Sequence, residues 1–147
     1  MTLRLSLVAL VAALAVVAPS ATGAPIPFKA TLKAPATQPT VGVKWPYSIK
    51  ATDLKGRPIR AMVTGVVIDP LGTAHAMDYG PTGPPNPGPP KPITNWPFKG
   101  TFRDYLIFPE DARLANQLGG LTLRWTVKAK IGGKTYKKIL KRLVKVQ

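Results

Sequence analysis

The sequence predicts an all-β chain that folds as an immunoglobulin-like antiparallel β-sandwich of about seven strands. Short runs of residues alternate between apolar and polar, which is the period of a strand with one buried and one wet face. Clusters of Gly, Pro and Asp separate these runs at short intervals. Helical patterning is almost absent, so two packed sheets are the simplest way to bury the apolar faces.

The first half of the chain contains four predicted strands. They cover residues 28–33, 43–52, 59–69 and, as a short strand, 73–79. Pro46 falls on the polar phase of the second strand. Because proline has no N–H to donate, we expect that strand at a sheet edge or a bulge. Asp53 and Asp69 lie between predicted strands and are interpreted as turn residues.

The middle of the chain is rich in proline. Residues 80–97 predict a stiff surface loop, because proline fixes φ and removes a hydrogen-bond donor. Trp96 and Phe98 close this loop and are expected to pack on the core. A further strand is predicted over residues 100–109, followed by one or two helical turns over residues 110–118. Asp104 is interpreted as an ion-pair partner for one of the many cations.

The C-terminal residues 120–146 predict a long β-hairpin. The first arm alternates strictly, and Gly132-Gly133 supplies the two positive φ angles of a tight turn. A rival interpretation makes residues 134–146 a basic amphipathic helix on a membrane surface. The tight turn favours a strand. We expect Trp125 of this hairpin to face Trp45 between the sheets, in place of a disulfide.

Residues 1–23 resemble a secretory signal peptide, and residues 24–147 form the predicted domain. Arg4 precedes an apolar stretch of the length of a signal core, and small residues lead to a cleavage site after Gly23. An uncleaved membrane anchor is the alternative, although the stretch is short for a spanning helix. The chain has no Cys, and export without disulfides favours a bacterial, extracytoplasmic or secreted protein.

The chain carries 21 Lys and Arg against 6 Asp and Glu, a formal net charge of +15. This charge favours an anionic partner: a cell-wall polymer or a membrane surface, with an envelope protein as the other candidate. A nucleic acid is the least favoured partner of a secreted protein. If the C-terminal hairpin has no bulge, Lys128 lies opposite Lys137 and Arg124 opposite Lys141. The predicted anion-binding face consists of Arg124, Lys128, Lys130, Lys137 and Lys141.

Catalysis is not predicted. After residue 23 the chain has one Ser, Ser48, one His, His75, and no Cys, and no nucleophile-elbow motif surrounds Ser48. No cofactor is predicted either, with copper as the alternative. His75 and Met77 lie two residues apart on one side of a predicted strand, and imidazole with thioether suits Cu(I). The remaining candidate ligand, Met62, lies on another predicted strand.

The segment PTVGVKWPYSIKATDLKGRPIRAMV resembles the opening of YtkA-like and related immunoglobulin-like domains of bacterial envelope proteins. The matching residues are Pro39, Val41, Gly42, Asp53, Gly56 and Pro58. The resemblance spans about forty residues and implies a sandwich fold and an extracytoplasmic location, but no particular activity.

The sequence therefore predicts a non-catalytic secreted or cell-envelope domain that binds an anionic polymer or a partner protein. Two alternatives stay open. One is a copper-binding protein that uses His75 and Met77. The other is a signal-anchored surface protein with a basic amphipathic C-terminal segment.

Overall fold

The computed structural model describes residues 25–80 and 91–147, so the predicted signal peptide, its cleavage site and most of the proline-rich loop lie outside the described residues. The described residues form eight strands and one 3₁₀ helix. The elements are β1 (Phe28–Lys33), β2 (Trp45–Asp53), β3 (Arg60–Ile68), β4 (Ala74–Ala76), β5 (Trp96–Lys99), β6 (Thr101–Leu106), η1 (Glu110–Leu118), β7 (Leu121–Ile131) and β8 (Lys134–Val144).

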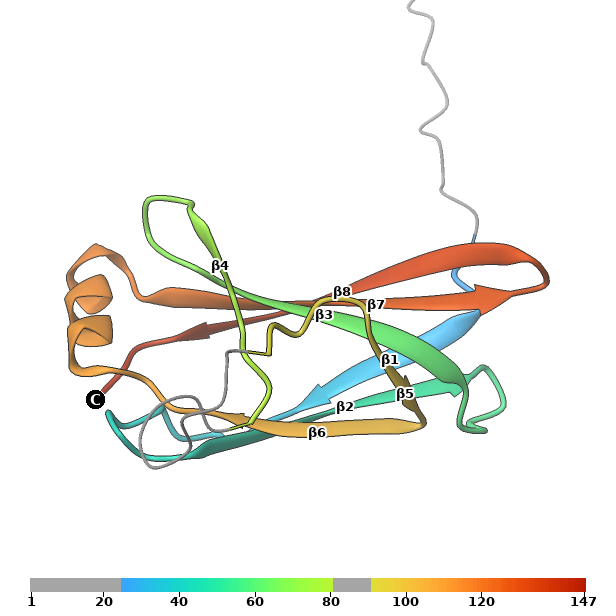
Figure 1. Cartoon of the computed structure of the whole chain (residues 1–147), viewed down its shortest axis with the longest axis horizontal. Helices are drawn as coiled ribbons and strands as arrows, with labels where there is room; N and C mark the ends of the chain where they lie inside the picture. Colours follow the sequence, from blue (N-terminus) through green and yellow to red (C-terminus); the bar gives the residue numbers. More distant parts are fainter. Residues whose placement is uncertain (1–24, 81–90) are drawn as a thin grey trace, which may run out of the picture.

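The strands form two antiparallel sheets that pack face to face (Figure 1). One sheet has the order β1-β2-β6. The other has the order β4-β3-β7-β8, and β5 pairs with β3 beside β4. β1, β2 and β6 thus occupy the places of strands A, B and E of an immunoglobulin domain, and β3, β7 and β8 those of C, F and G. The predicted all-β, immunoglobulin-like sandwich is confirmed.

Two strand predictions need correction. β2 was expected at an edge, but it is the central strand of its sheet. Its pairing with β1 ends at Ser48, so at Pro46 the strand has only β6 as a neighbour, and the proline is accommodated there. β5 was predicted as the end of a loop. Instead Trp96 and Pro97 belong to strand β5, which pairs with β3. No other described strand pairs with β5, so it is an edge strand, where a proline is tolerated.

The centre of the core is an aromatic pair that joins the two sheets. The Trp125 side chain is completely buried, and its ring centroid lies 4.9 Å from that of Tyr47. The pair therefore links the B and F positions, which a disulfide joins in antibody domains. Trp45 is also buried, but Tyr47 rather than Trp45 is the ring that lies against Trp125. The predicted Trp45–Trp125 pair is thus displaced by one inward-facing position.

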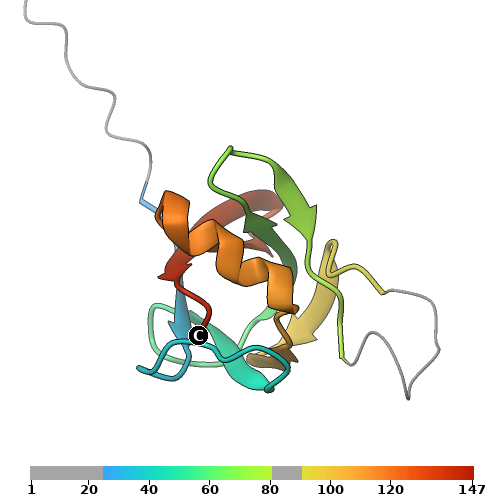
Figure 2. The ribbon, with the colours of Figure 1, turned by 90° about the vertical axis from the view of Figure 1, so that its left-hand side faces the viewer.

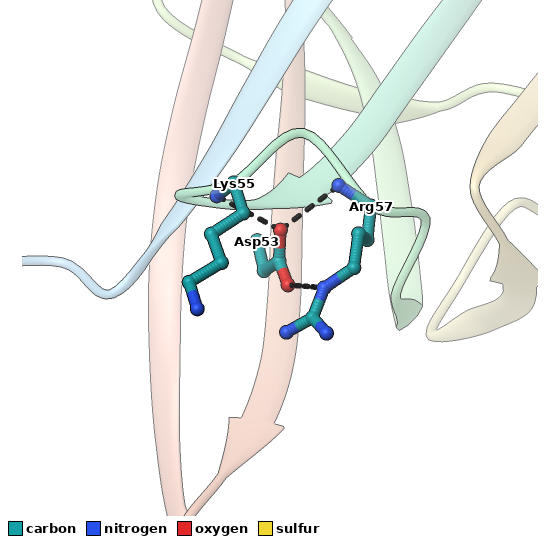
Figure 3. A network of polar contacts seen from close by, with 3 residues as sticks. All are labelled: Asp53, Lys55 and Arg57. Carbon is teal, nitrogen blue, oxygen red and sulfur yellow. Dashed lines mark hydrogen bonds and ion pairs between the residues drawn. The ribbon is translucent and has the colours of Figure 1, made fainter.

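Asp53 and Asp69 organise the turns on either side of β3, as predicted. Asp53 Oδ1 accepts hydrogen bonds from the backbone N–H groups of Lys55 and Arg57, both at 2.9 Å (Figure 3). Asp69 Oδ1 accepts from Leu71 N and Thr73 N in the same way. The side-chain hydrogen bond from Arg57 Nε to Asp53 Oδ2, at 2.7 Å, does most to hold the pKa of Asp53 below its ordinary value, and the backbone bond from Thr73 N does the same for the pKa of Asp69.

The C-terminal hairpin has the predicted register. Ile131 pairs with Lys134, and the pairing runs without a bulge to Leu121 and Val144. The segment after the turn is strand β8, so the amphipathic-helix interpretation of residues 134–146 is wrong. The two-residue Gly-Gly turn explains this outcome, because it returns the chain directly alongside β7.

The 3₁₀ helix η1 covers one end of the sandwich (Figure 2). Asn116 holds it to the C-terminal segment, since its side chain donates to Val146 O at 2.7 Å and accepts from Val146 N at 3.0 Å. One or two helical turns were predicted over residues 110–118, and the structure places a longer helix there, nine residues or about three turns of 3₁₀ geometry. None of the helices in the described part of the chain is long and apolar enough to span a membrane.

Candidate functional site: a basic groove on the outer sheet face

The outer face of the larger sheet gathers cations from four strands. Along β7 the even-numbered residues point outward, because their odd-numbered neighbours are buried. Residues paired directly across an antiparallel ladder share a face, so the register extends this set to β3, β5 and β8. The Lys and Arg residues of this face, which we call the basic face, are Arg60, Lys99, Arg124, Lys128, Lys130, Lys137 and Lys141.

The five residues predicted from the sequence are all members of the basic face. Within its strands the face carries no Asp or Glu. Like charges lie directly opposite each other at Lys128–Lys137 and Arg124–Lys141, as predicted, and also at Arg60–Lys99. Such pairs destabilise a sheet unless counter-charges approach them.

Part of the basic face is hollowed into a groove of about 630 Å³. Four of the seven cations line it, with Met62 and Pro97 between them. The four cations are Arg60, Lys99, Lys128 and Lys130. They come from three neighbouring strands, β5, β3 and β7, which are held together by backbone pairing. The groove is therefore a rigid, positively charged surface that can accept an extended anionic chain.

A polar contact orients one cation at the edge of the groove. Lys128 Nζ donates to Asn95 Oδ1 at 3.2 Å, and Asn95 N donates to Thr64 Oγ1 at 3.0 Å. Asn95 has a φ of 49°, a left-handed conformation that Asn tolerates better than most residues. The turn before β5 thus places an amide oxygen against Lys128 without neutralising its charge.

The carboxylates of the described residues lie away from the groove. Arg57, His75 and Arg113 contact Asp53, Asp69 and Glu110 respectively. None of the three ion pairs found among residues 25–80 and 91–147 involves a cation of the basic face. The groove therefore keeps its full positive charge.

Asp104 is not the ion-pair partner that the sequence suggested. It faces the core, is 9% exposed, and accepts hydrogen bonds from Tyr47 Oη at 3.4 Å and Gly80 N at 3.1 Å. Burial raises the pKa of its carboxyl group above the ordinary value. Burial likewise raises the pKa of the Tyr47 hydroxyl, while the nearby indole of Trp125 acts in the opposite direction. Trp125 Nε1 itself has no hydrogen-bond partner among the described residues.

The alternative copper ligands occupy the opposite end of the molecule from the hairpin turn. His75 and Met77 line the same cleft, although only His75 belongs to strand β4. However, His75 Nε2 lies 3.2 Å from Asp69 Oδ2, and Met77 is buried where Gly65 leaves room for its side chain. Met62 lines the basic groove instead. Across the described residues, no three His, Cys, Asp or Glu side chains cluster as metal ligands would.

The two residues considered for a nucleophilic site are also apart. Ser48 lies on β2 of the smaller sheet and His75 on β4 of the larger one. They line different clefts, so the described residues offer no Ser–His pair.

Sequence reasoning missed Arg60 and Lys99. Arg60 occupies the polar phase of its predicted strand, so its outward direction could have been found. Lys99 could not, because its place on the basic face depends on the pairing of β5 with β3.

Comparison of the chain with protein-family models, with curated proteins and with solved structures gives no match. The resemblance to YtkA-like domains therefore stays a prediction from the residues that carry it.

Proposed function

We propose that this chain is a non-catalytic secreted or cell-envelope domain that binds an anionic envelope polymer in the basic groove. The observation that carries the proposal is the groove itself, where Arg60, Lys99, Lys128 and Lys130 converge without a carboxylate. A concave strip of four cations suits an extended chain of phosphate or carboxylate groups. The signal-like residues 1–23 support a location where such polymers occur.

The experiment compares two double variants that lose the same charge. Lys99→Gln with Lys130→Gln removes two exposed cations of the groove. Lys29→Gln with Lys50→Gln removes two exposed strand cations from the smaller sheet. Binding to purified teichoic acid, a wall polymer of phosphates, is measured by titration calorimetry at low ionic strength.

We expect the groove variant to bind about twofold to tenfold more weakly than the control variant, since exposed ion pairs contribute up to about 1 kcal/mol each. Added salt should reduce the difference, because exposed charges are screened over about 8 Å at physiological ionic strength. Equal losses in both variants would mean that only net charge matters. Stronger binding to anionic lipid vesicles than to the polymer would assign the face to a membrane surface.

A further inference from the structure

A second cleft, of about 590 Å³, opens at the η1 end of the sandwich. Its walls are the end of β3 with the turn into β4, the segment after β6, and η1. Figure 1 shows these elements at one end of the long axis, while the β7–β8 turn lies at the other end. The cleft is thus separate from the basic groove, and the two share no lining residue.

The walls of this cleft carry large apolar side chains that face solvent. Leu71 is 84% exposed, and Leu114 and Leu118 are each 66% exposed. Ile107 adds a fourth exposed apolar side chain, and Met77 closes the floor. Large exposed apolar side chains gathered around a cleft are typical of a ligand-binding site.

The charge of the cleft is opposite to that of the rest of the chain. Asp69, Asp78 and Asp111 line it, which is half of all the carboxylates in the chain. Although the chain has 21 Lys and Arg, none of those in the described residues lines the cleft. If the charged residues of the chain were spread at random over its surface, the lining of this cleft would contain more Lys and Arg than Asp and Glu.

Two of these carboxylates are available to a ligand. Asp69 is occupied by its turn and by His75. Asp78 and Asp111 make no side-chain hydrogen bond or ion pair with any described residue. The acids do not converge as metal ligands. They line the same cleft as the exposed leucines, a combination that complements a cation attached to an apolar group.

We propose that this cleft binds a small organic amine with an apolar body. The apolar body lies against Leu114, Leu118 and Met77, and the protonated amine contacts Asp78 or Asp111 through a charge-assisted hydrogen bond. The cleft volume falls within the range of about 300–1,000 Å³ that is usual for small-molecule sites.

The test is a titration of the purified, isotope-labelled chain with octylammonium, followed through the backbone amide signals. Octanol has the same alkyl chain without the charge, and octanoate has the opposite charge. We expect octylammonium to shift the signals of cleft residues saturably. Octanol should need about twofold to fivefold higher concentration to give half of its maximal shift, because it lacks the contribution of a partly exposed ion pair. Octanoate should shift the signals of the basic face instead.

Matched variants locate the amine and the alkyl chain. Asp111→Asn should weaken octylammonium binding about twofold to fivefold, whereas Glu110→Gln, the neighbouring η1 residue that does not line the cleft, should not. Leu114→Ser should weaken binding about threefold or more through lost apolar contact. Leu54→Ser, a comparably exposed leucine elsewhere, should have no effect.

Several outcomes would overturn the proposal. Equal binding of octylammonium and octanol would mean that the carboxylates play no part. Shifts confined to residues outside the cleft would place the amine elsewhere. Without ligand, concentration-dependent shifts at the cleft would identify a second copy as its occupant. Contacts between the cleft and residues 1–24 or 81–90 would identify a segment of this chain instead.

Discussion

Asp104 is the residue at which the core departs from an apolar sandwich. Its carboxylate lies between the two sheets and accepts hydrogen bonds from Tyr47 and from the backbone of Gly80. It therefore fixes Gly80, at the start of the proline-rich segment, to the same core that holds the Tyr47–Trp125 pair. The cost of this anchor is a partly desolvated carboxyl group.

Replacing Asp104 with Asn should reveal that cost through its pH dependence. The pKa of Asp104 in the folded protein lies above the ordinary value of 3.8, so the folded state holds this proton to higher pH than the unfolded state does. The stability that this carboxyl contributes is therefore fully present below about pH 3.8 and is lost as pH rises through the folded pKa. Asn does not ionise.

We therefore expect Asp104→Asn to gain stability relative to the native chain as pH rises from acid to neutral, and to differ by less than about 1 kcal/mol in acid, where both side chains are neutral. Urea unfolding at several pH values measures this difference. The lowered pKa values of Asp53 and Asp69 act in the opposite direction but are common to both proteins. Asp104→Ala leaves Gly80 N without its acceptor, so this variant should be less stable than Asp104→Asn at every pH. A difference that does not change with pH would mean that Asp104 is ionised without penalty.

At the scale of elements, the sequence predicted the features that depend only on residues close to one another in the chain. The first and last strands, the Gly-Gly turn and the Lys128–Lys137 register follow from alternation and turn residues. β5 was missed because Pro97 argues against a strand, and only the free edge of β3 beside it makes the pairing possible. Only two of the four groove cations, Lys128 and Lys130, were predicted. Arg60 and Lys99 join the groove through pairing between segments that are distant in sequence.

β8 is an edge strand that carries many cations. An exposed edge can pair with another chain, and Lys residues along it oppose such pairing. Two of these lysines, Lys137 and Lys141, also lie opposite cations of β7. Lys137 lies opposite Lys128 on the basic face, whereas Lys138 lies opposite the apolar Val127 on the other side of the strand.

Lys137→Gln should therefore raise the free energy of unfolding by a few tenths of a kcal/mol at low ionic strength, because it removes a directly opposed like-charge pair. Lys138→Gln is the matched control and should give a smaller change. Urea unfolding of both variants in dilute buffer measures the effect. A loss of stability in Lys137→Gln alone would show that its aliphatic stem packs on the sheet more strongly than its charge repels.

At the scale of the whole molecule, the two proposed sites carry opposite charge. Among the described residues, those that line the basic groove include four cations and no carboxylate, while those that line the cleft at the η1 end include three carboxylates and neither Lys nor Arg. The two proposed sites would therefore attract ligands of opposite charge without competing for one surface. The separation also leaves the groove cations without a carboxylate partner among the described residues, so repulsion among them is stored in the folded state.

That repulsion should make stability depend on salt. With a formal net charge of +15, the compact chain is destabilised by its own charge, and salt screens this repulsion over about 10 Å at 0.1 M. We expect the midpoint of thermal unfolding to rise as NaCl is raised from a few mM to about 0.1 M. Lys99→Gln with Lys130→Gln should flatten this rise more than Lys29→Gln with Lys50→Gln, because Lys99 lies directly opposite the cation Arg60, whereas Lys29 and Lys50 lie opposite Thr52 and Thr31. A midpoint that falls with salt would mean that ion pairs such as Arg57–Asp53 outweigh the repulsion on the basic face.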